Sequence, residues 1–482
     1  MASVHREVER KYEPSAHTPL PSLDDLPDVS HVGTPAEQEL EAVYFDTSDL
    51  ALAAAGITVR RRTGGDDVGW HLKLPAGDGV RDELRVPLGR AKTTVPKALR
   101  AAVRVHARDR PMAAVATVRT HRTVLRLLDS EGRSLAQVCD DNVTAETPAP
   151  AETGSVTAWR EWEVELVEGG TSLLDAADEL FLRAGAAPAA RTSKLARVLG
   201  DRVPRDSATT TAALRTGGPA AAVVHARLCE QVAELKLRDP EVRRDVPDGV
   251  HKMRVALRRL RSALATFRPL VDQEVTEPLR EELKWIGGVL GDARDAEVMH
   301  GRLTTVIARE SAEPAEPALA AVTRRVDDEL HATHRSALTR ALEAMETDRY
   351  FRLLDDLDHL VADPPWTPLA RQPANHVLPG HVHHDWKRLR RHVAAAKQAT
   401  GRAQRDERLH EVRKAAKRTR YAAETLTSLY GRDARRLVKA TKRVQSLLGT
   451  HQDSVLTQAL LRQLGQAHLD GDNGFIYGRL HA

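Results

Sequence analysis

The stretch HREVERKYE at residues 5–13 places Glu7, Glu9 and Lys11 at alternate positions. In a β-strand, residues i, i+2 and i+4 project from the same face, so two carboxylates and one ammonium group are expected side by side. Carboxylates bind hard divalent cations, and cationic side chains bind phosphate oxygens. The stretch therefore predicts a strand that contributes to a site for a metal ion and a polyanion.

Charged residues alternate in the same way in other segments with strand character. An open antiparallel sheet can carry such charges on its solvated face, which is a common arrangement. However, the acidic segments lie at both ends of the first 200 residues and the basic segments lie between them, which favours a closed barrel with a charged interior. A barrel of eight strands has room inside for one small ligand. The alternating residues are Arg60 and Arg62 in 57–62, Lys73 in 69–75, Arg81, Glu83 and Arg85 in 81–85, and Glu161, Glu163 and Glu165 in 159–169.

Beyond residue 200 the sequence changes character. Residues 201–218 have linker composition, and helical periodicity runs through the rest of the chain. A proline-rich break at 363–380 splits the helical region in two. We therefore expect an α+β domain over 1–200, a linker over 201–218 and an all-α domain over 219–482, with halves of about 219–362 and 381–482.

The two helical halves repeat one basic pattern. LGDARD at 290–295 matches LGTHQD at 448–453, although the second copy lacks equivalents of Asp292 and Arg294. A period this long indicates a duplicated bundle. The basic residues that match at an offset of 159 (410 − 251) are His251, Arg254, Arg258, Arg259 and Arg261 with His410, Arg413, Lys417, Arg418 and Arg420.

This basic pattern has two interpretations. A solvated basic face is common on amphipathic helices. Acidic partners one turn away are nearly missing from 251–261, however, and the pattern occurs twice. Clustered cations in a chain of net charge +4 favour a polyanionic partner. Neither cluster is interleaved with the aromatic residues on which single-stranded nucleic acids stack, so nucleic acid is not favoured.

The bulk sequence excludes several classes of protein. A chain of 482 residues is expected to form more than one domain. The sequence has no apolar run long enough to cross a bilayer and no apolar signal segment at its start. Only Cys139 and Cys229 are present, so a disulfide framework is not expected. These features predict a cytoplasmic protein without a membrane partner, and its oligomeric state is left open.

The first 200 residues resemble the CYTH domain, also called the triphosphate tunnel metalloenzyme family. The resemblance rests on the ExExK stretch, the paired arginines, the lysine of HLKLP, the late ExE segment and a terminal SK, over about residues 3–200. It implies an eight-stranded antiparallel tunnel that hydrolyses or transfers triphosphates with Mg²⁺ or Mn²⁺. The sequence leaves open whether Arg119, Arg122, Asp140 and Asp141 face inward.

The resemblance also implies a role for each matching residue. The implied metal ligands are Glu7, Glu9, Glu163, Glu165 and Asp141. The implied catalytic residues are Glu7, Glu9, Lys11 and Glu161. The implied substrate-binding residues are Lys11, Arg60, Arg62, Lys73, Arg119, Arg122 and Lys194.

The segment HKMRVALRRLRSAL followed by LGDARD resembles the CHAD domain, over about residues 219–482. The resemblance implies two pseudo-symmetric four-helix bundles with a central basic surface for inorganic polyphosphate. His381, His383 and His384 have no carboxylate or cysteine nearby at ligand spacing, and we read them as the start of a helix. The implied polyphosphate-binding residues are His251, Lys252, Arg254, Arg258, Arg259, Arg261, His410, Arg413, Lys414, Lys417, Arg418 and Arg420.

Together the two resemblances predict an inorganic triphosphatase that also binds polyphosphate. The tunnel is expected to hydrolyse triphosphate to diphosphate and phosphate, and the helical domain can bring the protein to polyphosphate granules. One alternative is a non-catalytic polyphosphate-binding or granule-associated protein. Another is a different activity of CYTH tunnels, as a thiamine triphosphatase, nucleoside triphosphatase or adenylate cyclase. No base-recognition pocket can be read from the sequence, which favours a ligand made of phosphate alone.

Overall fold

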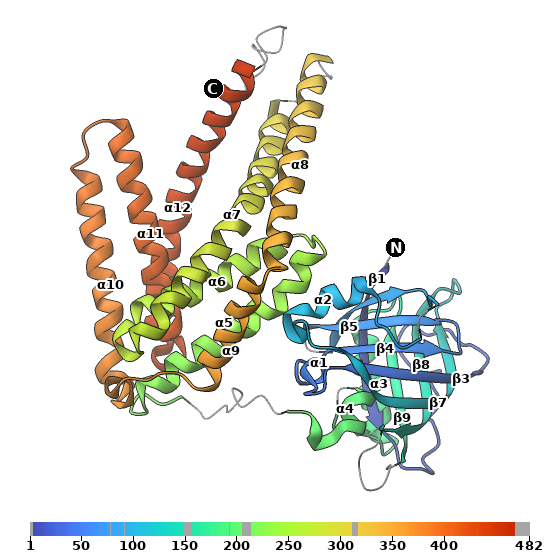
Figure 1. Ribbon diagram of the computed structural model, residues 1–482. Coiled ribbons are helices and arrows are strands. Elements are labelled where there is room, and N and C mark those ends of the chain that lie inside the picture. Colours follow the sequence, from blue (N-terminus) through green and yellow to red (C-terminus); the bar gives the residue numbers. More distant parts are fainter. Residues whose placement is uncertain are drawn as a thin grey trace. The chain divides into compact units, whose positions relative to one another are not determined.

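The computed structural model describes residues 3–77, 79–90, 92–148, 156–191, 193–204, 214–310 and 317–467. The chain divides into two compact units, residues 1–206 and 207–482 (Figure 1). Of the expected linker, residues 205–213 lie outside the described part. Within the described residues, no helix combines the length and the apolar character needed to cross a membrane.

Eight long antiparallel strands close into a barrel in the first unit. Their order is β1-β6-β5-β4-β3-β7-β8-β9, and pairing of β1 with β9, for example Lys11 opposite Glu163, closes the ring. Short strands β2 (His31–Val32) and β10 (Ala187–Pro188) pair with β7 and β1. The expected fold of this unit is confirmed. The barrel strands are β1 (Ser3–Glu13), β3 (Ala36–Asp46), β4 (Thr58–Thr63), β5 (Gly69–Gly77), β6 (Val80–Val86), β7 (Ala113–Leu128), β8 (Ser134–Glu146) and β9 (Thr157–Leu166).

The outer face of the barrel is the apolar one. Helices α1 (Ala51–Ala54) and α2 (Lys97–Ala107) share one core cluster with Trp70 on the outside of β5. On another side, α3 (Thr171–Arg183) packs its Phe181 ring 5.2 Å from that of Trp162 on β9. Because successive side chains of a strand point to opposite faces, covering the apolar face with helices turns the alternating charges inward. The solvated-sheet alternative is therefore wrong.

A short helix, α4 (Lys194–Leu199), enters one end of the barrel. Its Leu195 and Leu199 are buried among inward-facing residues such as Val118 and Val143. Ser193 caps the helix by accepting a hydrogen bond of 3.1 Å from the Ala196 amide. The helix begins inside the barrel, so Lys194 at its first position projects into the interior. A 3-10 turn, η1 (Gly200–Arg202), follows.

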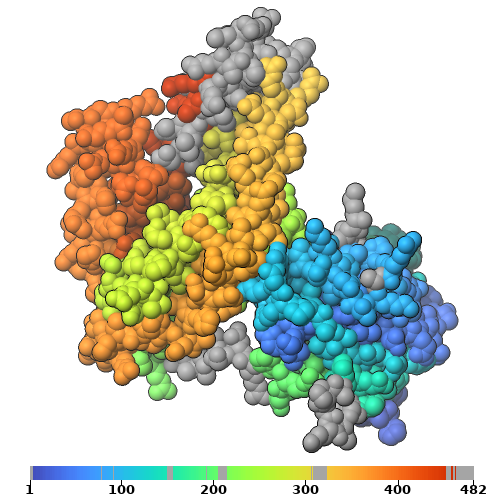
Figure 2. All heavy atoms as spheres, in the orientation of Figure 1, coloured from blue at the N-terminus to red at the C-terminus, as the bar shows by residue number. Residues whose placement is uncertain are grey.

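The second unit is all-helical in its described part. Its helices α7 and α8 run side by side, as do α10 and α11, and the two pairs diverge from a common base (Figures 1 and 2). Helix α12 starts beside α11 and its far part reaches α7, where the Thr457 hydroxyl lies 3.8 Å from the Met299 sulfur. The helices are α5 (Ala220–Arg243), α6 (Gly249–Thr266), α7 (Gln273–Glu310), α8 (Pro317–Met345), α9 (Asp348–Ala362), α10 (Ala374–Lys397), α11 (Arg402–Thr425) and α12 (Thr427–Ala467), with 3-10 turns η3 (Arg268–Leu270) and η4 (Pro368–Arg371).

A local twofold axis relates α5, α6 and α7 to α10, α11 and α12. At the axis the Ala220 amide donates to the Gln372 carbonyl (2.9 Å), and reciprocally the Ala374 amide donates to the Gly218 carbonyl (2.7 Å). Pro219 and Pro373 form the bridge between these bonds and set an offset of 154 (373 − 219) for α5 and α10. The duplicated helical fold is confirmed for these helices. A counterpart of α8 would fall after Ala467, outside the described residues.

The second half starts earlier than its sequence suggests. Helix α10 begins at Ala374, directly after Pro373, so His381, His383 and His384 lie inside the helix and not at its start. Pro379 prompted the wrong boundary, because proline removes one helical hydrogen bond and usually marks a break. Here it stands in the second turn of a 24-residue helix that continues through it.

Candidate functional site

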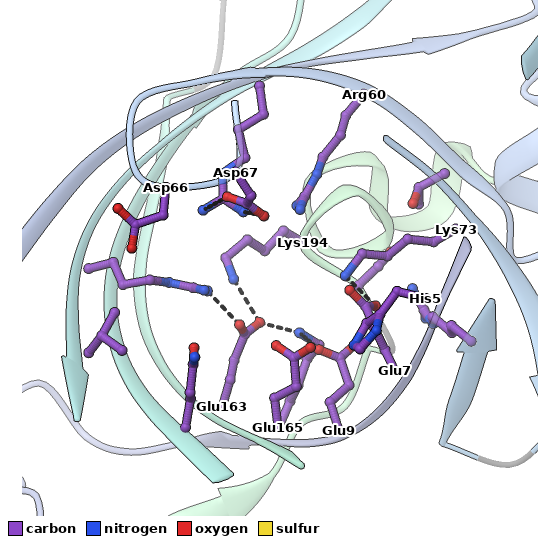
Figure 3. A pocket seen from close by; sticks show the side chains of 18 of the residues that line it. His5, Glu7, Glu9, Arg60, Asp66, Asp67, Lys73, Glu163, Glu165 and Lys194 are labelled. Carbon is purple, nitrogen blue, oxygen red and sulfur yellow. Dashed lines mark hydrogen bonds and ion pairs between the residues drawn. The ribbon is translucent and has the colours of Figure 1, made fainter. Parts of the chain in front are cut away.

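The charged faces of the strands line one cavity of about 430 Å³ inside the barrel (Figure 3). Each strand contributes residues spaced by two, so the same pleat that hides the apolar side chains outside gathers the charges inside. The sequence-predicted residues that line this cavity are Glu7, Glu9, Lys11, Arg60, Arg62, Lys73, Arg122, Glu163, Glu165 and Lys194.

Glu163 is the centre of the charge network. One carboxylate oxygen accepts from Lys11 and, at 2.8 Å, from Lys194, and the other accepts from Arg122 at 2.5 Å. Burial alone would raise the pKa of Glu163, but Lys11, Lys194 and Arg122 lower that pKa well below its usual range. The group is therefore ionised and holds three cations from β1, β7 and α4 around one point.

Glu163 also belongs to a group of three buried carboxylates that lie close together. Asp141, Glu161 and Glu163 have oxygens within 4.8 Å of one another, as metal ligands require. Lys194 Nζ already lies 2.6–2.8 Å from an oxygen of each. Arg122 also donates twice to Asp141, at 2.6 and 2.7 Å. An ammonium group thus holds the place where a divalent cation would bind this triad.

A second group of carboxylates, Glu7, Glu9 and Glu165, lines the cavity beside Lys73. Lys73 pairs with Glu7 at 2.7 Å, and Lys11 pairs with Glu9 at 3.1 Å. Among the described residues, nothing donates a hydrogen bond to Glu165 or pairs with it. Burial, and then the neighbouring Glu7 and Glu9, raise the pKa of Glu165 to about 7. This excess of buried negative charge fits a divalent cation, and oxygen ligands suit Mg²⁺ or Mn²⁺.

The opposite wall of the cavity is basic. Arg60 lies beside the Tyr44 hydroxyl and 4.0 Å from Glu83, and Arg62 pairs with Asp67 at 2.8 Å. Burial and then Arg60 lower the pKa of Arg62 to about 10, which reflects cations crowded together. Crowded cations with few carboxylates are suited to a highly charged anion.

Sequence reasoning missed two residues of this wall, Tyr44 and Asp67. Tyr44, Asp67 and Arg85 line the cavity, and buried Glu83 accepts from His71 (2.9 Å) and Arg85 (2.5 Å). The alternation in 81–85 gave a signal for Glu83 and Arg85. Tyr44 stands in an apolar strand and Asp67 in a turn, where no periodicity marks them.

The structure shows that one predicted substrate-binding residue, Arg119, lies outside the tunnel. It also shows which of Asp140 and Asp141 faces inward. Arg119 and Arg122 are three residues apart on β7, so they point to opposite faces. Arg119 lies outside the tunnel, 51% exposed, and pairs with Glu41 and Glu146 at 3.0 and 2.8 Å. On β8, Asp141 points inward, whereas Asp140 pairs with Arg160 at 2.6 Å on the outer side.

In the helical unit, cations of α6 and α11 meet where the two helices pack together. Lys417 on α11 is surrounded by Arg254 and Arg258 of α6 and by Arg413 and Arg420 of its own helix. We call these five residues the basic surface. In the described part of the chain no carboxylate pairs with Arg258, Arg413 or Lys417, and the Nε atoms of both arginines are buried without a hydrogen-bond partner.

Two glycines at matching positions of the repeat leave room for two arginines of the basic surface. Arg254 donates to the Gly291 carbonyl at 3.1 Å, and a Cβ atom added to Gly291 would lie 3.3 Å from the guanidinium. The same spacing of 3.3 Å separates a Cβ on Gly449 from Arg413. The glycines of LGDARD and LGTHQD therefore let each arginine lie flat on the next helix.

The other predicted polyphosphate-binding residues differ in their surroundings. Half-buried His251 and His410 stand on the same helix faces as the basic surface. Lys252 lies 3.9 Å from Glu241 and Lys414 pairs with Glu411 at 2.8 Å, both away from the basic surface. The structure also places Arg259, Arg261 and Arg418 outside the basic surface, the first beside Glu424, the second near Arg280 and the third beside Asp385.

A closed barrel around a charged tunnel, followed by a duplicated helical unit, defines a two-domain protein of the triphosphate tunnel class. Residues 5–198 match the CYTH domain family, and residues 226–462 match the CHAD domain family. The chain belongs to the CYTH–CHAD family. CYTH domains bind triphosphate substrates and depend on metal ions, so the first unit is a domain of the phosphoryl-transfer or hydrolase kind.

Two curated relatives match almost the whole of this chain. Two uncharacterized proteins of Mycobacterium tuberculosis, MT2285 (strain CDC 1551 / Oshkosh) and Rv2226 (strain ATCC 25618 / H37Rv), are each 39% identical to this chain over 493 residues. The match covers 99% of this chain and 92% of each relative.

Several solved structures are similar to parts of this chain. PptA from Streptomyces chartreusis is 25% identical, covers 55% of this chain and 93% of its own, and has a TM-score of 0.45. The CHAD domain from the plant Ricinus communis is 28% identical, with coverages of 56% and 87% and a TM-score of 0.45. HpAC1 from Hippeastrum, a putative adenylyl cyclase described with a dominant triphosphatase activity, is 17% identical, with coverages of 40% and 93% and a TM-score of 0.23.

Proposed function

We propose that the tunnel hydrolyses inorganic triphosphate to diphosphate and phosphate with Mg²⁺ or Mn²⁺, and that the helical unit binds inorganic polyphosphate. The observation that carries the proposal is the opposition of two charged walls in one cavity of about 430 Å³. Glu7, Glu9, Glu163 and Glu165 form an acidic wall that suits a metal ion, and Arg60, Arg62 and Arg122 suit phosphate oxygens. We further propose a cytoplasmic protein that associates with polyphosphate granules.

The cationic residues of the tunnel act by exchanging carboxylate partners for phosphate oxygens of the substrate. Without substrate, Lys11, Arg122 and Lys194 are paired with carboxylates. When triphosphate enters, these cations turn to its oxygens and stabilise the charge that develops on the transferred group. Glu165 and the carboxylates released from these cations would hold the metal ion, which when bound would supply Lewis-acid polarisation of phosphate oxygens and a water molecule of lowered pKa. The Trp159 indole donates a hydrogen bond of 2.6 Å to one oxygen of Glu161. The other oxygen of Glu161 pairs with the Lys194 ammonium group and keeps it in place.

Inorganic triphosphate is favoured over nucleotide substrates by the chemistry of the cavity. Its lining is dominated by Arg, Lys, Glu and Asp side chains, and Tyr44 is its only aromatic residue other than His5 among those described. The Tyr44 hydroxyl lies beside Arg60, so this ring is tied into the charge network. A purine or thiazole ring usually needs an apolar or aromatic surface to stack on.

The activity is tested by phosphate release from tripolyphosphate, ATP and thiamine triphosphate, each with Mg²⁺ or Mn²⁺. We expect tripolyphosphate to give the highest kcat/KM, with no release in EDTA. Replacing Arg122 by glutamine is expected to reduce kcat/KM about 10²-fold, since one preorganised donor is lost. Arg119→Gln is the matched control, because it makes the same change on the outer face of the same strand. Equal rates for the two variants would sink the assignment of the tunnel as the active site.

Polyphosphate binding is expected to weaken as the pH rises above 7. Burial, and then Arg413, Arg258, Arg254 and Arg420, lower the pKa of Lys417 to about 7. The free protein therefore loses this charge above pH 7, and binding must restore it with a proton, so the association constant should fall by up to about tenfold per pH unit. Burial, and then Arg294 and Arg258, lower the pKa of His251 from its usual value. Fluorescence anisotropy with a labelled long-chain polyphosphate at pH 7–9 measures the effect.

Lys417→Arg provides the control for this pH dependence, because a guanidinium stays charged over the whole range. We expect its polyphosphate affinity to stay flat between pH 7 and 9. A wild-type protein with an equally flat profile would contradict the role of Lys417.

A further inference from the structure

The local twofold axis of the helical unit relates a filled carboxylate site to an open one. In the filled site, Glu424 at the end of α11 forms ion pairs with Arg227 (3.0 Å), Arg259 (3.2 Å) and Arg420 (3.4 Å). These cations come from α5, α6 and α11. A single carboxylate therefore neutralises arginines from three helices.

The second site keeps most of the cations but lacks the carboxylate. The offsets of 154 for α5/α10 and 159 for α6/α11 assign each counterpart (381 − 227, 418 − 259, 420 − 261, 424 − 265). Ala265, with no polar side chain, stands where the filled site has Glu424. The remaining counterparts are His381 for Arg227, Arg418 for Arg259 and Arg261 for Arg420.

A cavity of about 390 Å³ lies at the open site, lined by Ala265, His381 and Arg418 and also by Arg268, Arg280 and His384. Its position is explained by the missing Glu424 equivalent. The cavity lies beside Arg418, whose guanidinium is held by the Ala265 carbonyl at 2.9 Å. A bound group there would occupy the place of the counterpart carboxylate.

The acidic residues around the open site do not balance its cations. Asp385, which replaces the counterpart Gln231, pairs with Arg418 at 2.7 Å and accepts from Thr266 at 2.6 Å. Glu277 is shared by Arg268 (2.7 Å) and Arg280 (2.5 Å). Arg261 lies near Glu281 but forms no ion pair within 4.0 Å in the described part of the chain, and the Arg280 Nε atom is buried without an acceptor. Among the described residues, the three carboxylates of Asp385, Glu277 and Glu281 thus face four guanidinium groups.

We propose that this cavity binds a small oxyanion of the size of orthophosphate, in the position that Glu424 fills in the other half. Guanidinium groups bind carboxylate and phosphate oxygens with the same fork geometry. The site is separate from the basic surface, since none of Arg254, Arg258, Arg413, Lys417 and Arg420 lines it. The inference therefore does not depend on the proposed triphosphatase activity or on polyphosphate binding.

The test restores the missing carboxylate. Isothermal titration of the full chain with orthophosphate, in EDTA and low salt, should show a site in the wild type that Ala265→Glu loses or weakens at least about tenfold, since charge-assisted bonds to the anion are replaced. Ala332→Glu, the same change at an exposed position of α8, should bind orthophosphate as the wild type does. A parallel titration with acetate distinguishes a carboxylate from a phosphate ligand.

Two further results decide the proposal. Ala265→Gln fills the cavity without adding charge and should also weaken binding, so the test stands if the glutamate variant does not fold. Equal orthophosphate and acetate binding by the wild type, Ala265→Glu and Ala265→Gln would overturn the proposal, because any anion would then be bound elsewhere. No binding of either anion to the wild type would overturn it as well.

Discussion

Replacing Glu163 by glutamine is expected to lower kcat for metal-dependent tripolyphosphate hydrolysis by ~10³-fold, more than any other single change in the tunnel. The neutral amide cannot hold Lys11, Lys194 and Arg122 around one point, as the carboxylate does at 2.5–2.8 Å for the latter two. It also removes one proposed oxygen ligand of the metal ion. Initial rates of phosphate release at saturating Mg²⁺ measure the loss.

Glu41→Gln is the matched control for this change. Glu41 lies on β3 and pairs with Arg119 on the outer face, so the same loss of one charge occurs outside the tunnel. Its rate should stay within about twofold of the wild type, as expected of an exposed ion pair. Thermal unfolding of both variants separates loss of activity from loss of the barrel. Retention of wild-type kcat in folded Glu163→Gln would exclude this network from catalysis.

The barrel could be predicted because its charge pattern is local. Glu7, Glu9 and Lys11 alternate within five residues, and a strand converts that spacing directly into one face. Closure of the barrel was inferred from the order of acidic and basic segments, and the pairing of β1 with β9 confirms it. The residues that escaped prediction lack a periodic signal: Asp67 stands in a turn, and Tyr44 stands in an apolar strand.

The orientation of single residues depended on register, which the sequence did not define. Arg119 and Arg122 both stand in one basic strand, and only their odd spacing on β7 sends one outward and one inward. In the helices the opposite problem arose. Arg259 and Arg418 belong to the repeated basic pattern, yet each lies off the basic surface beside a carboxylate. Those carboxylates, Glu424 and Asp385, occupy different positions in the two halves, so comparison of the repeats alone could not reveal them.

Reversing the charge of Arg258 is expected to weaken polyphosphate binding ~10²-fold at low salt, because a glutamate would face the anion from the middle of the basic surface. Arg258 has no carboxylate partner among the described residues, so its removal leaves no unpaired acid. The logarithm of the association constant should also depend less steeply on the logarithm of salt concentration, by about one unit for each phosphate group that the protein no longer neutralises. Fluorescence anisotropy with labelled polyphosphate at 50–300 mM salt, roughly the range where counterion release dominates, measures both quantities.

Lys252→Glu is the decisive comparison for the basic surface. It makes the same kind of reversal on the same helix, six residues away, but at an exposed position 3.9 Å from Glu241. Non-specific attraction between a basic domain and a polyanion would make the two reversals equivalent, since each changes the net charge by two. A site formed where α6 meets α11 requires Arg258→Glu to lose far more affinity and more of the salt dependence than Lys252→Glu. Equal losses would therefore refute the basic surface as a binding site, even with polyphosphate still bound by the wild type.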